Sequence, residues 1–338
     1  MSDDAVPPGQ QGTQATLGKL GNLGWLRIIV RLVLGLSLLG AVLWFLLEAG
    51  GTPHLRFVAW AWGVGMVGSV LANAVTSRRW QLLSETMTST RLPYGVYFHH
   101  LAYTRVLSQF LPSLVVDLVG RSASLRAAGS SESMGRLLAP LVLERVLDLV
   151  LPAVLLGWAL AWRAGGLDEA AAWSSLVALV VVFSLVSIAS LRLMVVVALR
   201  VRRWIRRERD AIEVPAVDRP LALRVTMLSL ARYATIMLQY WGGGAGLGVT
   251  LSAMVLLSSA PLAQLAGLIG ITPGALGLQE GGWAGALTVL GVAPADIAVF
   301  VIATRGTIIV NFALITVLSW RWRVPPAAAA APVDAAGR

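Results

Sequence analysis

The chain has 338 residues, of which 57% are hydrophobic and only 13% are charged, and its mean hydropathy is +0.75. Soluble domains carry about 25% charged residues, so this composition excludes a soluble enzyme and predicts a polytopic membrane protein. The net charge of +10 does not indicate nucleic-acid binding, because the arginines gather in short loops between apolar runs and no binding motif accompanies them. Cysteine is absent, which excludes disulfides, thiolate metal sites and cysteine nucleophiles.

Apolar runs long enough to span a membrane begin soon after a polar N-terminal tail. Residues 1–20 lack the apolar core of a signal peptide, so we predict a disordered cytoplasmic tail. About 20 apolar residues cross a core of about 30 Å, and the runs at 25–49 and 57–76 meet that length. Residues 77–100 are amphipathic and are predicted to lie on the inner membrane surface. Residues 101–120 form an apolar run broken by polar residues and a proline.

The second part of the chain continues this alternation. Spans are predicted over 137–162, 171–199, 221–241, 249–269 and 297–320, with a second broken segment at 271–280 that continues through 290. Residues 324–338, rich in Ala and Pro, are predicted to be a disordered tail. The fold class is therefore all-α, a bundle of about seven or eight spans in one transmembrane domain over 21–323. Both broken segments could cross the membrane or return.

Two glycine runs have structural interpretations. Gly63, Gly65 and Gly68 match the form G-x-G-x-x-G, but a dinucleotide site needs a preceding strand. Within an apolar helix these glycines predict close helix packing instead. The glycines between residues 242 and 248 are predicted to form a turn between two spans.

Charge distribution predicts the orientation of the chain. The arginine-rich run at 200–209 should be cytoplasmic by the positive-inside rule. The N-terminus and the C-terminus should lie on that same side, and the acidic loop with Asp168 and Glu169 should lie outside. The predicted location is the cell membrane.

The broken segments are the candidate functional elements. Non-helical backbone at membrane depth must be buried in protein or face a wet cavity, and an ionisable side chain there costs about 2.5 to 3.5 kcal/mol. Pro112 is followed 33 residues later by Arg145, and Pro273 is followed 32 residues later by Arg305. Similar breaks in two halves are typical of a transporter site at a repeat interface. The chain therefore contains either an internal repeat or a coincidence of spacing.

Helix-end amides at such breaks attract anions, and an arginine fork suits phosphate. The acidic residues near the arginines have two interpretations. Either they neutralise the charge of the arginines when no ligand is bound, or they form ion pairs that only fix the packing of the helices. Glu144 and Asp148 share one helix face, and Arg145 can reach Asp148 at i,i+3. The predicted substrate-binding residues are Pro112, Asp117, Arg121, Glu144, Arg145, Pro273, Gly274, Gly277, Glu280 and Arg305.

In these residues the chain resembles the membrane region of lysylphosphatidylglycerol synthases, a family also called flippase-like. Two motifs carry the likeness, which covers residues 24–322. The first motif is Gln109-Phe110-Leu111-Pro112-Ser113 through Asp117 to Arg121, then Glu144-Arg145, and the second is Thr272-Pro273-Gly274 with Gly277, Glu280 and Arg305. The chain departs from the family pattern at Val115-Val116, where glycines are common. The resemblance implies an integral membrane protein that moves or holds a phospholipid-like substrate, without the aminoacyl transfer of the separate soluble synthase domain.

Three functions fit the sequence. The favoured one is a lipid translocase for an anionic phospholipid or an isoprenoid-phosphate lipid. The second is an intramembrane lipid-modifying enzyme, with Glu280 or Asp117 as a general base. The third is a non-catalytic partner of a separately encoded lipid-modifying enzyme. No P-loop or catalytic triad is readable, and we expect no cofactor or metal. The expected partners are membrane lipids, and either a second copy of the chain or that enzyme.

Overall fold

The computed structural model describes residues 30, 33–45, 47–48, 55–166, 168–206, 218–268 and 272–323. The predicted tails at 1–20 and 324–338 lie outside the described residues, as does part of the first predicted span at 25–49. Within that span, Val33–Phe45 is a short apolar helix.

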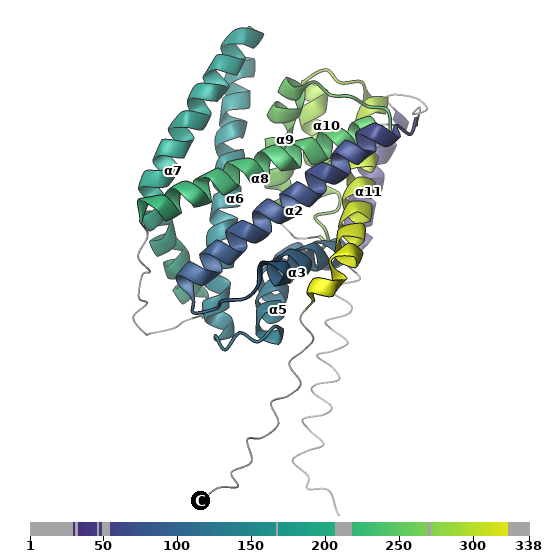
Figure 1. The fold of residues 1–338 in the computed structure, drawn as a ribbon. Coiled ribbons are helices and arrows are strands. Elements are labelled where there is room, and N and C mark those ends of the chain that lie inside the picture. The colour runs from purple at the N-terminus through teal and green to yellow at the C-terminus, as the bar shows by residue number, and fades with distance from the viewer. Residues whose placement is uncertain are drawn as a thin grey trace, which may run out of the picture.

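The described chain is built from helices, which confirms the all-α prediction. In order they are α2 (Ala59–Met87), α3 (Tyr94–Leu107), α4 (Ser113–Val115), the π-helix η1 (Val116–Gly120), α5 (Arg121–Ala127), α6 (Met134–Gly165), α7 (Glu169–Arg206), α8 (Arg219–Gly246), α9 (Ala253–Leu268), α10 (Leu278–Val289), α11 (Pro294–Leu318) and the 3-10 helix η2 (Trp320–Trp322). Figure 1 shows α2 and α8 crossing the bundle obliquely, with α6 and α7 on one side and α11 on the other.

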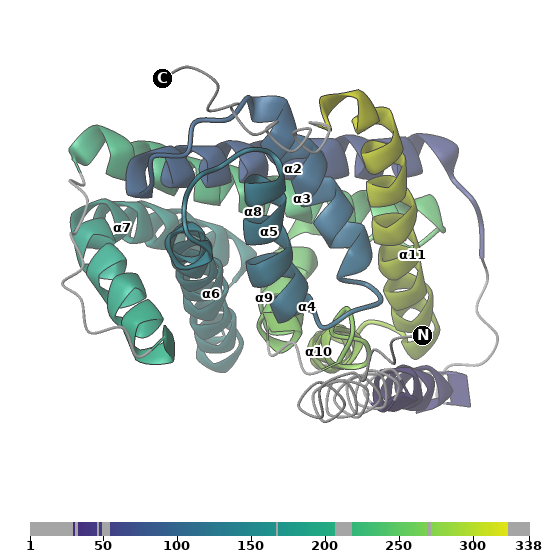
Figure 2. The same cartoon turned by 90° about the horizontal axis from the view of Figure 1, so that it is seen from below.

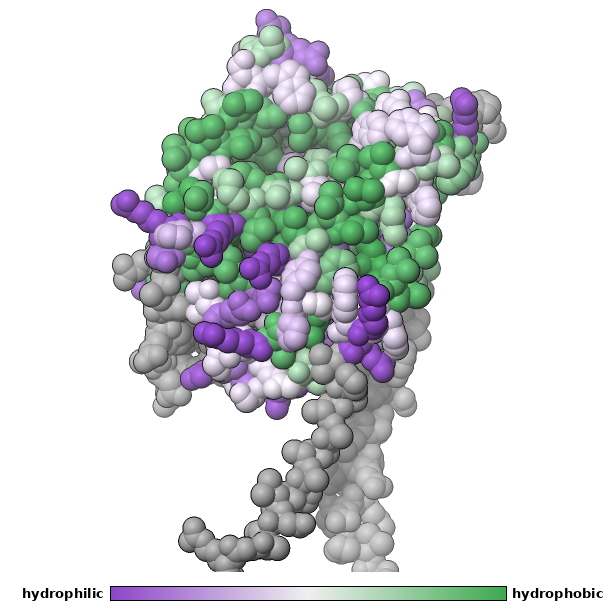
Figure 3. Space-filling model, viewed as in Figure 1, coloured by the Kyte–Doolittle hydropathy of each residue, from purple (hydrophilic) through white to green (hydrophobic). Residues whose placement is uncertain are grey.

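Four helices in the described part of the chain are long and apolar enough to cross a membrane: α2, α8, α11 and the Glu169–Leu191 part of α7. The surface agrees with a membrane location, since an apolar belt covers the middle of the face in Figure 3 and hydrophilic residues gather toward the end where α3 and α5 lie. α6 has 32 residues but carries Glu144, Arg145 and Asp148 in the half that begins near α5. Its charges therefore lie about ten residues, or about 15 Å, inside the bundle.

The prediction of a surface-lying segment over 77–100 is wrong. α2 continues to Met87 without a break, and the side chains of Arg79 and Trp80 are only 1% and 0% exposed. Arg79 forms ion pairs with Glu144 and Asp148 of α6, and a buried cation becomes tolerable when it is paired in this way. The sequence pattern of residues 77–87 is amphipathic because the polar face of this part of α2 packs against a polar protein interior.

The prediction of a turn over residues 242–248 is also wrong for most of that run. α8 extends to Gly246, and α2 and α8 lie side by side in both views (Figures 1 and 2). A Cβ atom added to Gly242 would lie 2.2 Å from the backbone nitrogen of Gly65, and one added to Gly68 would lie 2.6 Å from that of Gln239. The glycines therefore let two helix backbones touch, as predicted for Gly65 and Gly68. Only Gly248, with φ +98°, takes a turn conformation.

The two predicted breaks are present, and they face each other. After α3 the chain turns through Pro112 into α4 and η1, and after α9 it breaks before α10. Pro112 and Pro273 form an isolated antiparallel bridge, the only extended pairing in the described residues. The two broken segments thus meet at these prolines, while their crossing or returning in a membrane stays a prediction.

Candidate functional site

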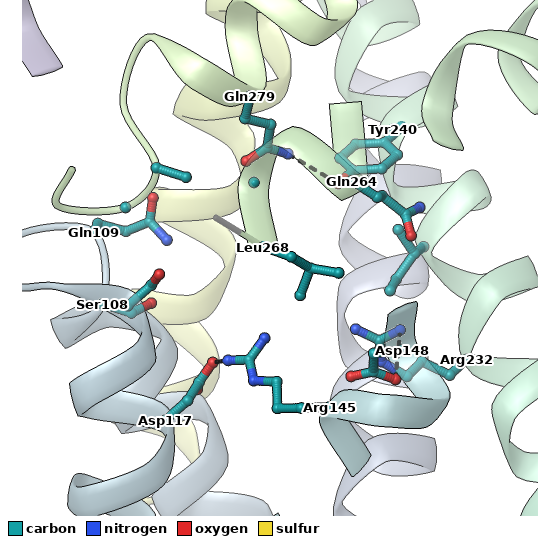
Figure 4. A pocket seen from close by; sticks show the side chains of 15 residues that line it. Ser108, Gln109, Asp117, Arg145, Asp148, Arg232, Tyr240, Gln264, Leu268 and Gln279 are labelled. Atoms are coloured by element: carbon teal, nitrogen blue, oxygen red, sulfur yellow. Dashed lines mark hydrogen bonds and ion pairs between the residues drawn. The ribbon is translucent and has the colours of Figure 1, made fainter. Parts of the chain in front are cut away.

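A polar cavity of about 180 Å³ lies between the two breaks and helices α6, α8 and α9. Asp117, Arg145, Asp148 and Arg232 project into it, as Figure 4 shows. A second space of about 190 Å³ is lined by the same four side chains and also by Arg105. The two spaces therefore form one polar cavity inside a bundle whose outer surface is apolar.

One wall of the cavity is a network of buried ion pairs on α6. Arg79 donates to Asp148 at 2.7 Å and to Glu144 at 3.4 Å. Arg121 donates to Glu144 at 2.6 Å, and Arg232 lies 3.2 Å from Asp148. Each of these two carboxylates is thus shared by two arginines, which compensates the cost of burying them.

The opposite wall is formed by the first break. Arg145 pairs with Asp117 of η1, whereas the sequence led us to expect that Arg145 pairs with Asp148. π-helical turns are rare in proteins overall, but those that occur are frequently found at functional sites. Here the π-helical turn places Asp117 opposite α6. The two side chains of this pair are 27% and 19% exposed, so the pair is more accessible than those around Glu144.

The second break is held by Arg305 of α11. Its guanidinium donates to Glu280, to the side-chain oxygen of Gln109 at 2.6 Å and to the backbone oxygen of Gly274 at 2.9 Å. Glu280 in turn accepts from the backbone N–H of Gly277 at 2.8 Å, which caps the start of α10. One arginine thus ties both breaks together.

Gly274 is required where the two breaks touch. Its φ is +57°, and a Cβ atom there would lie 3.0 Å from the Cα of Gln109 and 3.2 Å from the Nη1 of Arg305. A side chain would therefore separate the breaks and push Arg305 from its partners.

The structure brings the predicted residues into two connected groups. Asp117, Arg121, Glu144, Arg145 and Gly274 line the polar cavity. Glu280 and Arg305 lie just behind it, and Gln109 joins the two groups. The remaining predicted residues, Pro112, Pro273 and Gly277, form the backbone of the breaks themselves.

Several cavity residues were missed by the sequence analysis. Arg232 lies inside the apolar run of α8, and an ionisable residue at membrane depth is a sufficient signal by itself. Arg79 was placed in the segment predicted to lie on the membrane surface, and Arg105 was interpreted as a polar interruption of the first broken segment. Gln264, Gln279 and Tyr240 also line the cavity, and no motif in the sequence distinguishes them.

The cavity and its surroundings have an excess of positive charge. Six arginines face four carboxylates: Arg79, Arg105, Arg121, Arg145, Arg232 and Arg305 against Asp117, Glu144, Asp148 and Glu280. No carboxylate of the described residues lies within ion-pair distance of Arg105, which instead donates to the Thr76 hydroxyl at 3.4 Å and lies 4.8 Å from the centre of the Phe312 ring. An anion would complete this arrangement.

Unpaired hydrogen-bond donors reinforce that conclusion. The Nε atoms of Arg121 and Arg232 and the side-chain nitrogen of Gln264 are buried and have no hydrogen-bond partner among the described residues. Such groups are rare in folded proteins and usually have an explanation. The side chains of Arg232 and Gln264 line the first space and that of Arg121 lines the second, so these donors lie beside the place where a ligand's acceptor oxygens would be.

The comparisons with known proteins agree with the geometry. A model of the family described as lysylphosphatidylglycerol synthase TM region matches residues 28–324. No curated protein and no solved structure gave a match. The matched region contains both breaks, the ion-pair network and every predicted site residue. The chain therefore belongs to the lysylphosphatidylglycerol synthase transmembrane-region family and is a multi-pass membrane protein.

Proposed function

We propose that this protein is a lipid translocase that carries an anionic phospholipid or isoprenoid-phosphate headgroup through the polar cavity. The observation that carries the proposal is the excess of arginine over carboxylate in a cavity enclosed by apolar helices. A headgroup phosphate brings negative charge, which no carboxylate of the described residues supplies to Arg105. It also brings acceptor oxygens, which the Nε of Arg232 and the side-chain nitrogen of Gln264 lack. The hydrocarbon chains can stay in an apolar environment while the headgroup crosses.

The ion pairs have different parts in this proposal. The pairs around Glu144 are buried and fix the helices, because removing one partner would leave an uncompensated charge. The Arg145–Asp117 pair is more exposed, so Arg145 can exchange its carboxylate partner for a phosphate of the same charge sign. Arginine forms bidentate, charge-assisted bonds with either group.

The contact between the breaks is the proposed gate. Gln109 and Gly274, the neighbours of the bridged Pro112 and Pro273, line the cavity, and Arg305 ties these two residues together. Passage of a headgroup past this point requires the contact to open. Two short segments without regular helical hydrogen bonds can separate at lower cost than two packed helices.

Exposed charges support an orientation. Eight exposed arginines lie in or next to α5, the second half of α2, the loops that flank α3 and α5, the start of α8 and the end of α11: Arg78, Arg91, Arg126, Arg136, Arg219, Arg224, Arg321 and Arg323. We call this the α3–α5 end. The opposite end carries Arg56 and Arg163 against Asp168, Glu169 and Asp296. By the positive-inside rule, the first end and the C-terminus face the cytoplasm of a cell membrane.

The test is lipid movement in liposomes. The purified protein is reconstituted with a trace of fluorescent phosphatidylglycerol, and a membrane-impermeant quencher reports the accessible dye over time. We expect the accessible fraction to rise beyond the outer-leaflet share, and to rise more slowly for Arg105→Gln at equal protein content. Dye accessibility identical to that of empty liposomes, for several anionic headgroups and with an ion gradient imposed, contradicts transport. That result together with co-purification of a lipid-modifying enzyme would favour the partner function.

A further inference from the structure

The first helix of the described chain, Val33–Phe45, packs directly against the second break. Glycines bring the two segments into contact. A Cβ atom added to Gly35 would lie 2.9 Å from the Cβ of Leu276, and one added to Gly277 would lie 2.2 Å from the Cβ of Leu38. A side chain therefore fits at either glycine only if the helix and the break move apart.

The Val33–Phe45 helix is attached to the rest of the molecule by one apolar face. On that face, Leu39, Val42 and Leu43 pack against the main hydrophobic core. Its other large apolar side chains are exposed: Val33, Leu34, Leu36, Trp44 and Phe45. The one side-chain hydrogen bond among its described residues joins Trp44 to Glu48 of the same segment. The helix can therefore move outward without breaking a side-chain hydrogen bond of these residues to the bundle.

The second break separates this helix from the polar cavity. Gly274 and Ala275 line the cavity, and the next two residues, Leu276 and Gly277, contact the helix. The wall between the polar cavity and the Val33–Phe45 helix is thus a single turn of chain.

That turn has an unfavourable backbone conformation. Gly274, Ala275 and Gly277 have φ values of +57°, +54° and +80°, and Ala275 is the one residue other than glycine with positive φ in the described chain. Such a conformation persists only where the surroundings impose it. Here Arg305 donates to the backbone oxygen of Gly274 at 2.9 Å, and Leu38 covers Gly277. Release of either contact should let the turn rearrange.

We propose that the Val33–Phe45 helix controls the gate from the membrane side: seated on Leu276 and Gly277 it holds the second break shut, and its outward movement opens the polar cavity to the membrane. This inference rests on the proposed function and names its regulation. The second break touches the first at Pro273 and the helix at Gly277. It can leave the first break only by moving toward the helix, where the close contact of Leu38 leaves no space unless the helix moves too.

A reversible disulfide tests the inference. Gly35→Cys and Thr272→Cys place two Cβ atoms 3.3 Å apart, close to the distance of about 3.5 to 4.5 Å in natural disulfides. The natural chain has no cysteine that could interfere. In the liposome assay with the full-length double variant, we expect oxidation to slow lipid transport about tenfold or more, and a reductant to restore it. The two single-cysteine variants are the controls, and their transport should not respond to the oxidant.

A second measurement does not depend on transport. Ser108→Cys places a thiol in the polar cavity, and its rate of labelling by a membrane-dissolved pyrene maleimide reports opening toward the membrane. Gly35→Ala forces a methyl group between the helix and Leu276 and should raise this rate about fivefold. Gly40→Ala is the matched control, since Gly40 is exposed on the same helix and a Cβ atom there would have no atom of the described residues within 4 Å.

Leu38→Ala loosens the same contact without added bulk, because it removes most of the side chain that covers Gly277. It should raise the labelling rate in the same direction, and Leu36→Ala, at an exposed position, should not. Thermal unfolding in detergent identifies the variants that are folded.

The outcomes separate this inference from the proposed function. Equal transport by the oxidised and reduced double variant would overturn the inference, as would equal labelling in the Gly35→Ala and Gly40→Ala variants. Faster labelling in Gly35→Ala, combined with no lipid movement by the natural chain, would uphold the control of the gate by the helix and contradict the translocase.

Discussion

Pro112 and Pro273, which are 161 residues apart in the sequence, lie opposite each other in an antiparallel bridge. A proline cannot donate a backbone hydrogen bond, so this bridge is a weaker contact than a sheet pairing. Much of what holds it comes from Arg305, which binds Gln109 before the first proline and Gly274 after the second. Closure of the breaks thus depends on one side chain of a third helix.

The first prediction concerns this side chain. Arg305→Lys keeps the charge near Glu280 but cannot reach Gln109 and Gly274 with the same fork. We expect the variant to insert and express, and to lose most lipid transport. The measurement is the liposome assay at matched protein content. Full transport combined with reduced thermal stability would show that Arg305 only fixes helix packing.

The second prediction separates binding from packing at Arg105, which is half-buried, and Arg79, which is buried. Arg105 has no carboxylate partner among the described residues, so Arg105→Gln leaves no charge uncompensated. Losing its bond to the Thr76 hydroxyl should change stability by about 1 kcal/mol, the contribution of one hydrogen bond. Loss of a bond to a charged group, about 1.5 to 3 kcal/mol, should weaken lipid binding about tenfold or more. Binding is measured by photo-cross-linking of the reconstituted protein to a trace of phosphatidylglycerol that carries a diazirine, in competition with unlabelled lipid.

Arg79→Gln is the matched comparison for Arg105→Gln. It removes the shared partner of Glu144 and Asp148 and should destabilise the folded protein by about 3 kcal/mol, as seen in thermal unfolding. Equal stability loss in both variants would contradict the assignment of Arg105 to the ligand.

The third prediction is topological. The natural chain has no cysteine, so a single introduced cysteine reports its own side of the membrane. Arg126→Cys should be protected from an impermeant thiol reagent added to intact cells, and Glu169→Cys should react. The reverse pattern would invert the proposed orientation. Both side chains are exposed in the structure.

The fourth prediction concerns Glu132, in the loop before α6 and outside the spanning helices. The hydroxyl of Ser89 donates to its carboxylate, as does the backbone N–H of Ser89 at 3.0 Å. These bonds, helped by Arg136, hold the pKa of Glu132 below its usual value. The unfolded glutamate has a pKa of about 4.3, so the stabilisation is complete above that pH and is lost as the pH falls through the lower folded pKa.

The matching variant is Glu132→Gln, which keeps the shape and removes the charge. We expect it to lower the free energy of unfolding by about 1 kcal/mol at pH 7. Its midpoint of thermal unfolding should approach that of the natural protein as the pH is lowered below 4. A difference that stays constant with pH would show that charge has no part in this contact.

Much of the architecture could be predicted from the sequence because membrane helices obey a simple rule of length and polarity. The breaks were found because Pro112 and Pro273 interrupt apolar runs, and the charged positions Glu144, Arg145, Glu280 and Arg305 were found because charge at depth is costly. The internal repeat stays a prediction, although in both halves the acid of the break pairs with the arginine of a following helix.

The rest depended on contacts that no local pattern contains. An amphipathic segment has the same sequence pattern whether its polar face contacts water or a polar protein interior. The sequence analysis therefore placed Arg79 on the surface. A run of glycines is typical of a turn, and the sequence does not show which helix packs against it. The packing of Gly242 on Gly65 was therefore missed. The pairing of Arg145 depended on a π-helical turn, which has no recognised sequence signal.

That π-helical turn, Val116–Gly120, has a consequence for how the first break tolerates change in length. A π-helical turn is a place where an α-helix accommodates one extra residue. That extra residue rotates the side-chain directions of all the helical residues that follow it. Deleting one residue, for example Val119, would let the segment relax to a regular α-helix and rotate Arg121 relative to Asp117. Natural relatives that shorten this segment should therefore change the residues opposite Asp117 and Arg121 together, whereas the surface loops can vary in length independently.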